Sequence, residues 1–362
     1  MRILLAPDDF AGTLTAEEAA AAIAAGWRRT APDDQLDLAP LSDGGTGFLG
    51  VLLTAVGGRL QPVQVTGPLG EQVAAELLVV GDTAYVESAR AAGRHLVPPG
   101  AQDPARATSY GVGQLIAAAV DSGARRVVVG VGGTATNDGG AGALVALGAR
   151  LDPAPDGVPA LSRLERADLA PARRRLAGVE LIAATDVDHV LVGEQGASAI
   201  FGPQKGASPE LVAQLDAALR RWAEVAGRSA ADAPGAGAGG GLGYALMLLG
   251  GARVSGAAMV LDLLDVGARA AEADLVVTGE GSFDWQSLRG KVISEVARAA
   301  REAGRPCVVL AGRVEVGRRE MAALGVEAAY ALSPDRAGDP VEGAAAERLA
   351  ALAAHVAHSW SH

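Results

Sequence analysis

The chain has 362 residues, of which 49% are hydrophobic, so its length predicts two domains that can each bury a core. A formal net charge of −11 argues against nucleic acid as a partner, since contact with a phosphate backbone needs a basic surface. The single cysteine excludes an internal disulfide framework. Without a signal peptide or a run of about 18 apolar residues, we expect a cytoplasmic protein with no membrane partner.

Strand and helix patterns alternate at both ends of the chain. The predicted strands are Arg2–Ala6, Leu36–Pro40, Leu275–Thr278, Pro306–Ala311 and Val326–Leu332, and the predicted helices are Thr15–Arg29, Gly45–Thr54, Lys291–Ala303 and Val341–His355. Five strands with helices between them are typical of a doubly wound parallel sheet. In the strand order 2-1-3-4-5, the first and third strands are neighbours, and ligands bind beyond their carboxyl ends.

The central part of the chain has a different pattern. Leu60–Val80 alternates apolar and polar residues around turn signals, which favours an antiparallel hairpin. Further elements are predicted at Tyr110–Val120, Arg126–Gly130, Gly139–Gly148, Glu180–Ala184 and Pro209–Ala226. We therefore predict an α/β protein in which a flavodoxin-like domain, residues 1–56 and 267–362, is interrupted by a mixed-sheet domain, residues 57–266, that supplies the opposite wall of a cleft.

Two of the 31 basic residues are lysines, Lys205 and Lys291. Both lie next to glycine, which lets a backbone approach a ligand closely. A lysine retained in an arginine-rich chain indicates a compact charge for phosphate or carboxylate oxygens, with chance retention as the alternative.

Glycine-rich segments form a second group of candidates. The pattern Asp-Gly-Gly-x-Gly starts at Asp43 and again at Asp138, and each copy precedes a predicted helix. Open N–H groups at such a helix start favour an anion, whereas the aspartate could instead cap the helix or hold a metal. The second copy extends back to Gly132 directly after a predicted strand, as in phosphate loops of nucleotide sites. Gly235–Gly243 is either a flexible linker or a close-packed turn near a ligand.

Acidic residues follow two of the predicted strands. Asp186 and Asp188 come directly after Glu180–Ala184, where they could hold Mg²⁺, orient a hydroxyl group or lie in a solvated loop. The loop after Leu275–Thr278 carries Glu280, Asp284, Gln286 and Lys291 at the predicted switch point. The histidines lack the spacing of a zinc site, and no Gly-x-Ser-x-Gly motif indicates a serine hydrolase.

With these segments the chain resembles the bacterial glycerate kinase family nearly from end to end. The resemblance is carried by Ala6–Gly12, Ser42–Gly45, Thr108–Gly111, Gly132–Gly142, Asp186–Asp188, Phe201–Ala207, Gly235–Gly243 and Thr278–Lys291. It implies a two-domain kinase that uses ATP and Mg²⁺ to phosphorylate glycerate, usually D-glycerate to 2-phosphoglycerate.

The resemblance and the residue chemistry together give each candidate a role. We predict Asp284 as the base, with Asp186 as the alternative, and Asp186 and Asp188 as Mg²⁺ ligands. Lys205 and Lys291 are predicted to neutralise the transferring group or the acceptor carboxylate. The other predicted substrate or nucleotide contacts are Asp8, Asp9, Asp43, Gly44, Gly45, Gly132, Gly133, Thr134, Asn137, Asp138, Gly239, Gly240, Glu280 and Gln286.

The chain departs from the family pattern in three places. One is His189-Val190, where the family usually has Asn-Pro after the carboxylate pair, and the other two lie in the first two loops. The family usually has a lysine where this chain has Ala11 and a glutamate where it has Thr46. We hypothesise that the family residues form an ion pair that was lost here as a unit, since removing one partner of a buried pair is costly. The changes leave open another small hydroxy acid as the acceptor, or a non-catalytic sugar-acid sensor.

Overall fold

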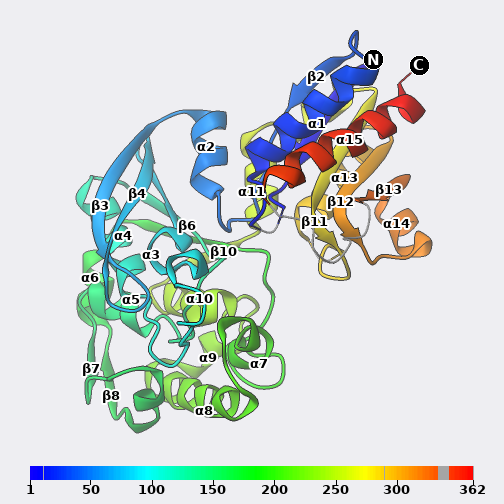
Figure 1. Ribbon diagram of the computed structural model, residues 1–362. Coiled ribbons are helices and arrows are strands. Elements are labelled where there is room, and N and C mark those ends of the chain that lie inside the picture. Colours follow the sequence, from blue (N-terminus) through cyan, green and yellow to red (C-terminus); the bar gives the residue numbers. More distant parts are fainter. Residues whose placement is uncertain (11, 289, 333–341, 362) are drawn as a thin grey trace. The chain divides into compact units, whose positions relative to one another are not determined.

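The computed structural model describes residues 1–10, 12–288, 290–332 and 342–361, and the chain forms two compact units (Figure 1). The terminal unit comprises Met1–Asp43, Gly50–Val56 and Ser255–His362, and the inserted unit comprises Gly44–Leu49 and Gly57–Val254. Residues 255–266, which the sequence-based division gives to the inserted domain, belong to the terminal unit because α11 (Gly256–Leu263) packs on α13 (Val292–Glu302).

Among the described residues, the terminal unit holds a five-stranded parallel sheet in the order β2-β1-β11-β12-β13. The strands are β1 (Arg2–Pro7), β2 (Gln35–Leu38), β11 (Leu275–Phe283), β12 (Cys307–Val314) and β13 (Ala328–Ala331). This confirms the predicted doubly wound fold, with the first and third strands of the sheet side by side. The switch point therefore lies beyond the carboxyl ends of β1 and β11.

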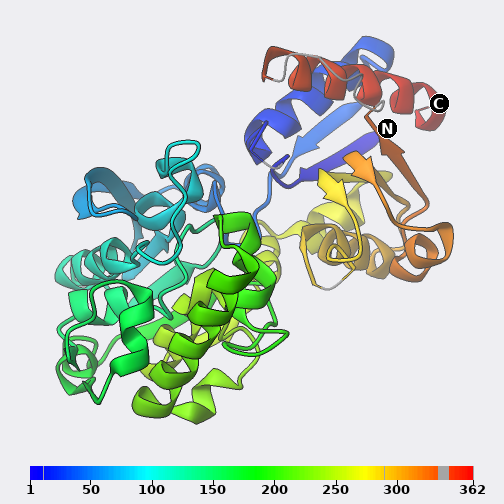
Figure 2. The ribbon, with the colours of Figure 1, turned by 60° about the horizontal axis from the view of Figure 1, so that its bottom comes forward.

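Helices cover both faces of this sheet. α1 (Ala16–Thr30) and α15 (Glu342–Trp360) lie side by side on one face, and α13 lies on the other with α11 and α12 (Val266–Glu272) (Figure 2). A capping box between Thr15 and Glu18 starts α1. Gly26 lets α1 approach α15 closely, because a Cβ there would lie 1.9 Å from the Ala350 carbonyl oxygen.

Two further helices of the N- and C-terminal segments are α2 (Phe48–Val56) and α14 (Arg318–Leu324). The predicted closing helix corresponds to α15, and its predicted first residue, Val341, lies outside the described residues.

Buried apolar side chains of the sheet, such as Leu5 and Val277, pack with Trp27 of α1 and Val356 of α15 into one core. The terminal sheet is thus held by residues from both ends of the chain.

Every residue of the inserted unit is described, and its main sheet has six strands in the order β10-β9-β6-β5-β4-β3. The β3–β4 pair is antiparallel, as is β4–β5, and the pairs from β5 to β10 are parallel, which confirms the predicted hairpin and the mixed sheet. The strands are β3 (Arg59–Thr66), β4 (Gln72–Val80), β5 (Thr83–Glu87), β6 (Arg126–Gly130), β9 (Glu180–Ala184) and β10 (Ala252–Val254), with a separate pair β7 (Arg150–Asp152) and β8 (Arg166–Asp168).

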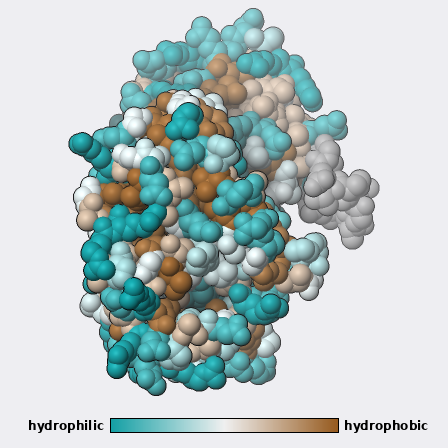
Figure 3. Space-filling model, turned by 90° about the vertical axis from the view of Figure 1, so that its left-hand side faces the viewer, coloured by the Kyte–Doolittle hydropathy of each residue, from teal (hydrophilic) through white to brown (hydrophobic). Residues whose placement is uncertain are grey.

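The helices of the inserted unit surround this sheet. They are α3 (Ala89–Ala92), α4 (Tyr110–Asp121), α5 (Ala141–Ala146), α6 (Ala170–Arg175), α7 (Ala197–Phe201), α8 (Pro209–Ala226), α9 (Arg228–Ala231) and α10 (Ala238–Leu248), with short 3-10 turns η1 (Arg94–Leu96), η2 (Val158–Arg163) and η3 (Pro203–Lys205). On the face shown in Figure 3, hydrophilic residues divide the hydrophobic surface into patches.

In the described part of the chain, none of the helices has both the length and the hydropathy needed to cross a membrane.

Candidate active site

The loop after β1 lies beside the carboxyl-terminal part of β11 at the switch point of the terminal sheet. The Asp8 amide donates to the Gly279 carbonyl oxygen (2.8 Å), and the Gly281 amide donates to the Asp9 carbonyl oxygen (3.3 Å). These bonds follow from the parallel pairing of β1 with β11, which brings residues more than 270 positions apart into register. The predicted loops therefore meet at the edge where ligands of open α/β sheets bind. Ala11, in the first loop, lies outside the described residues.

Charged side chains at this end of the terminal sheet form what we call the acid–lysine cluster: Asp8, Asp43, Glu280, Asp284 and Lys291. The pKa of Glu280 is raised to about 7, chiefly by burial; the Ser287 hydrogen bond and the charge of Lys291 act against this rise, and the Asp43 and Asp284 carboxylates add to it. Burial, followed by the Asp43 and Asp9 charges, raises the pKa of Asp8 well above its ordinary value. The cluster therefore favours binding a proton near neutral pH.

Lys291 is the cation of this cluster. Burial alone lowers the pKa of its ammonium group, but Asp43, Glu280, Asp8 and Asp284 together outweigh burial and raise it. The residue is also the N-cap of α13, a helix of 11 residues whose first N–H groups point toward the same end. A charged ammonium group beside a helix start is an arrangement suited to an anion such as a carboxylate or a phosphate.

Glu280 and Asp284 have different surroundings. The Glu280 side chain accepts a hydrogen bond from the Ser287 hydroxyl group, and the residue is 8% exposed. The Asp284 carboxylate accepts hydrogen bonds from the Gln286 amide (2.8 Å) and the Ser282 hydroxyl group (3.4 Å), which holds the loop in an Asx-type turn. Gln286 itself is exposed. Asp284 thus shapes the loop, whereas Glu280 is the buried acid of the cluster.

In the inserted unit, Asp138 organises the glycine loop between β6 and α5. Its carboxylate accepts hydrogen bonds from the amide and hydroxyl groups of Ser109 (both 2.8 Å) and from the amides of Gly140 (3.0 Å) and Gly142 (3.2 Å). Burial raises the pKa of Asp138, and these donors act against that rise. Three of these donors meet Oδ2 and one meets Oδ1, so both carboxylate oxygens are used within the protein and the surroundings of Asp138 are those of a structural cap.

The glycine run before and within α10 is a close-packed turn, which decides between the two alternatives left by the sequence. Gly239, Gly240 and Gly241 have φ values of 60°, 69° and 95°, a region that L-residues rarely adopt. A Cβ at Gly240 would lie 1.9 Å from the Thr136 carbonyl oxygen, and the Gly139 amide donates to the Gly240 carbonyl oxygen (3.0 Å). The run therefore supports the loop 132–140 by direct backbone contact.

Lys205 approaches the same loop from η3. Its ammonium group is buried, with the residue 4% exposed, and donates to the Thr136 carbonyl oxygen (2.6 Å). The pKa of Lys205 is lowered to about 7, chiefly by burial and also by the charge of Arg94, while Asp138 acts in the opposite direction. On the loop itself, Thr134 Oγ1 and Asn137 Oδ1 are buried with no hydrogen-bond partner in the described structure. Because a buried unpaired polar atom costs about 1–3 kcal/mol, these atoms indicate a ligand or water site.

The predicted metal ligands follow β9, as expected, but their surroundings differ. Asp186 is half-buried, whereas Asp188 is exposed and forms an ion pair with Arg253. Among the described residues, no group of three or more His, Cys, Asp and Glu side chains is arranged to hold a metal ion. Mg²⁺ in phosphate-transferring sites is commonly held by one or two carboxylates plus the substrate phosphates, so Asp186 fits such an ion better than the ion-paired Asp188.

The first glycine motif packs on the edge of the inserted sheet. A Cβ at Gly44 would lie 2.6 Å from the Ala184 carbonyl oxygen, and a Cβ at Gly132 would lie 2.7 Å from the Gly45 Cα. Glu87, at the carboxyl end of β5, accepts hydrogen bonds from the amides of Gly47 (3.2 Å) and Leu49 (3.1 Å). Gly133 also lies against this segment, since its Cβ would lie 2.5 Å from Thr46 Oγ1.

Sequence reasoning missed four residues of these arrangements: Glu87, Ser109, Ser287 and Arg94. Glu87 carried a usable signal, because it is an acid at the end of a buried strand, like Asp186. Ser109 lies within a segment that carries the family resemblance. Ser287 and Arg94 had no local signal, since their roles depend on neighbours that only the fold brings close.

Comparisons with known proteins agree with these features. A family model described as the glycerate kinase family matches residues 3–361. The chain is 44% identical over 324 residues to the glycerate kinase of Haemophilus influenzae, covering 86% of both chains. It is 43% identical to the glycerate 2-kinase of Escherichia coli, covering 86% of this chain and 85% of that one. A crystal structure of a Salmonella typhimurium protein provisionally named glycerate kinase 2 superposes with a TM-score of 0.79 at 39% identity, covering 99% and 98% of the two chains.

Proposed function

Because the chain belongs to the glycerate kinase family, we propose that it transfers the terminal phosphoryl group of ATP to a hydroxyl group of glycerate. Relatives named glycerate kinase at 40–44% identity support this acceptor, and the one named glycerate 2-kinase supports 2-phosphoglycerate as the product. D-glycerate is the enantiomer that we propose. The structural observation that carries the proposal is a buried acid with a near-neutral pKa beside a lysine at the switch point.

The reaction moves one phosphoryl group and one proton. The glycerate hydroxyl oxygen forms a bond to the terminal phosphorus of ATP, the bond from that phosphorus to the bridging oxygen breaks, and ADP leaves with its electron pair. The hydroxyl proton passes to a base, and a base works best when its pKa lies near the working pH. We propose Glu280 for this role in place of Asp284, because Glu280 is the buried acid of the cluster and Asp284 holds the loop.

The other groups of the acid–lysine cluster position the acceptor. Lys291, with the first N–H groups of α13, binds the glycerate carboxylate, since the acids of the cluster keep its ammonium group charged. Asp8, which faces Lys291 in the cluster, forms a hydrogen bond with a hydroxyl group of the acceptor. These assignments need a substrate that is small and carries both a carboxylate and a hydroxyl group, which describes a hydroxy acid.

The inserted unit supplies groups for ATP. Lys205 is a cation beside a glycine loop that carries unpaired buried polar atoms, which fits the phosphates of a nucleotide. Asp186 would hold Mg²⁺, with Arg253 and Asp188 as a neighbouring ion pair that fixes the loop. When bound, Mg²⁺ neutralises negative charge on the phosphates and on the transferring group. The protein residues otherwise position the reactants and exclude water, which is most of what phosphoryl transfer requires of a protein.

The test is a steady-state assay of ADP formation with ATP, Mg²⁺ and D-glycerate, followed by ³¹P NMR of the product. We expect ADP release that depends on D-glycerate, a product with the phosphate on the 2-hydroxyl, and loss of activity in EDTA that added Mg²⁺ reverses. A panel of hydroxy acids in the same assay checks the acceptor. If ATP is consumed only with another hydroxy acid, the acceptor assignment is wrong, and if no acid stimulates ADP release, the proposed reaction is wrong.

A further inference from the structure

We infer that the inserted unit binds the whole nucleotide, with the adenosine in an apolar slot between α4, α5 and η2 and the phosphates in the neighbouring cavity at Lys205. The inference deepens the proposed kinase function and rests on it, because it assigns a place to the ATP of that reaction. Most of the slot lies outside the motifs that the sequence marked as nucleotide-binding. Three of its residues, Asp138, Ala141 and Gly142, belong to the second glycine motif and connect the slot to the glycine loop.

The slot has a volume of about 490 Å³ and a mainly apolar lining. Its walls include Tyr110 at the start of α4, Val145 of α5, Leu151 of β7, and Val158 and Leu161 of η2. Cavities of about 300–1,000 Å³ with apolar walls and a few polar groups are typical of small-molecule sites. Val145 is 37% exposed, so this wall presents an apolar side chain to whatever enters the slot.

A cation-lined cavity adjoins the slot. It has a volume of about 320 Å³, and Arg94, His95, Gln204 and Lys205 contribute to its lining. Ala107 lines both the slot and this cavity, so one residue separates the apolar space from the positively charged space. An apolar space for a base next to a cationic space for phosphates matches the two chemically different ends of a nucleotide.

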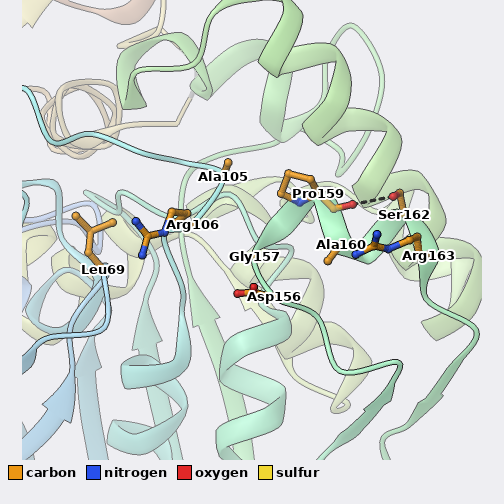
Figure 4. Close-up of a pocket in the computed structure, with 9 residues that line it drawn as sticks. All are labelled: Leu69, Ala105, Arg106, Asp156, Gly157, Pro159, Ala160, Ser162 and Arg163. Atoms are coloured by element: carbon orange, nitrogen blue, oxygen red, sulfur yellow. Dashed lines mark hydrogen bonds between the residues drawn. The ribbon is translucent and has the colours of Figure 1, made fainter.

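Arg106 extends the positive charge along the border of the slot. It lines the slot and also an adjoining hollow of about 530 Å³, whose other wall carries Arg163. Figure 4 shows the Arg106 side chain directed toward Leu69, and Leu69 also lines the Lys205 cavity. The guanidinium group of Arg106 therefore lies on the side of the slot from which phosphates would extend.

Two buried atoms on the glycine loop next to the Lys205 cavity lack a hydrogen-bond partner among the residues that the structure describes. Thr134 is 4% exposed and Asn137 is fully buried, and neither Thr134 Oγ1 nor Asn137 Oδ1 has a hydrogen-bond partner within the inserted unit, all of which is described. Both lie on the loop whose Ala135 lines the Lys205 cavity. Lys205 itself uses one of its three donors, on the Thr136 carbonyl oxygen, which leaves donors for phosphate oxygens.

The nucleotide site and the acid–lysine cluster differ in the balance of their charged residues. The cluster of the terminal unit combines Asp8, Asp43, Glu280 and Asp284 with one cation, so it repels a polyphosphate. The Lys205 cavity combines Lys205 and Arg94 with Asp103 as the acid of its lining, and Arg106 adds positive charge beside it. The phosphates of ATP are therefore better matched by the inserted unit, and the small acid by the terminal unit.

The experiment titrates the full-length protein with adenosine and with AMP-PNP plus Mg²⁺, using calorimetry, and measures the KM of ATP and of D-glycerate. Val145→Trp fills the slot, so we expect both adenosine and AMP-PNP to bind at least 10-fold more weakly, with the KM of D-glycerate unchanged. Lys205→Met removes the phosphate contact and the hydrogen bond to the Thr136 carbonyl oxygen but changes no residue that lines the slot, so we expect weaker binding of AMP-PNP by at least 10-fold and unchanged binding of adenosine.

Controls separate this inference from the proposed function. Leu263→Trp changes a side chain of similar exposure, 38%, in the terminal unit and should leave all four quantities unchanged. Ala154→Trp, at an exposed position of the slot wall, replaces Val145→Trp if that variant does not fold by circular dichroism. The inference is overturned if the folded slot variant binds AMP-PNP with the wild-type Kd while the wild type turns over ATP and glycerate. Absence of turnover in the wild type would instead contradict the proposed function.

Discussion

Replacing Glu280 by glutamine separates the catalytic role of this acid from its effect on stability. The amide side chain would keep the size of the acid and an oxygen that accepts the Ser287 hydroxyl, while it removes the charge and the site for a proton. If Glu280 is the base, the substitution abolishes proton transfer. If Glu280 is only a structural residue, the same substitution relieves a buried charge and leaves the reaction intact.

The expected change in stability follows from the pKa. A rise from the ordinary value of 4.5 to about 7, at about 1.4 kcal/mol for each tenfold change in proton affinity, corresponds to about 3 kcal/mol. Below pH 4.5, folded and unfolded chains both carry the proton, so wild type and variant should be equally stable. As the pH rises from 4.5 to about 7, the unfolded chain releases its proton first, and the wild type loses stability relative to Glu280→Gln. Above pH 7 the variant should be more stable by about 3 kcal/mol.

Glu280→Gln should lower the reaction rate even though it raises the stability. A general base contributes about 10²–10⁴-fold to the rate, so kcat of Glu280→Gln should fall by at least about 100-fold. In the wild type, kcat/KM for D-glycerate should rise about tenfold per pH unit below about pH 7 and level off above it. Because Asp8, Asp43, Asp284 and Lys291 face Glu280, the midpoint will report the cluster as a coupled system.

The assay pairs urea unfolding at about pH 4 and about pH 8, on either side of the expected transition, with initial rates of ADP formation across the same pH range. Asp284→Asn is the matched control, because it also removes one negative charge from the cluster but leaves Glu280 in place. We expect it to keep the acidic limb of the pH profile. An active Glu280→Gln enzyme with an unchanged acidic limb would refute Glu280 as the base. If the two proteins are equally stable at the higher pH, the charged form of Glu280 does not destabilise the folded chain, and the reasoning from burial is wrong.

Three further predictions concern the inserted unit and the lysines. Lys205→Met and Lys291→Met should each lower turnover by at least about 100-fold with the fold intact by circular dichroism, and near-normal rates in both would contradict their roles. Gly240→Ala should lower the free energy of unfolding by about 3 kcal/mol or more, because its Cβ would overlap the Thr136 carbonyl oxygen, whereas Gly250→Ala, with φ +89° and open space, should cost about 1 kcal/mol in the same urea titration. Asp138→Ala should lower that free energy by about 3 kcal/mol through the loss of four hydrogen bonds, and a change below about 1 kcal/mol would contradict its role as a cap.

Much of the architecture was accessible from the sequence because it depends on local patterns. Apolar runs separated by amphipathic helices indicate a doubly wound sheet wherever they occur, and alternation within Leu60–Val80 indicates an antiparallel hairpin. Strand order then places Asp8 and Glu280 at the switch point without further information, since the carboxyl ends of β1 and β11 must be neighbours. Glycine motifs indicated backbone segments in close contact, which Gly44 and Gly240 both show.

The chemistry of individual side chains was less accessible, and Asp138 and Glu280 show why. Asp138 belongs to the same motif type as Asp43, and only the donors of Ser109, 29 positions earlier, make it a cap. Glu280 lies near the carboxyl end of β11 and Asp284 directly follows that strand, and the sequence contains their spacing but not their burial. Lys205 likewise acquires its lowered pKa from burial and from Arg94, which is remote in the sequence.

The amino-acid sequence by itself determined which elements form, how the strands alternate with helices, and which residues with reactive side chains follow the strands. These properties depend on near neighbours in the chain, whose periodicity can be read directly. Only the tertiary structure decided which acid is buried, which aspartate is a cap and where an apolar slot borders a cationic cavity. Burial and charge–charge interaction depend on distances between residues remote in sequence, such as Asp43 and Lys291, and those distances exist only after the chain has folded.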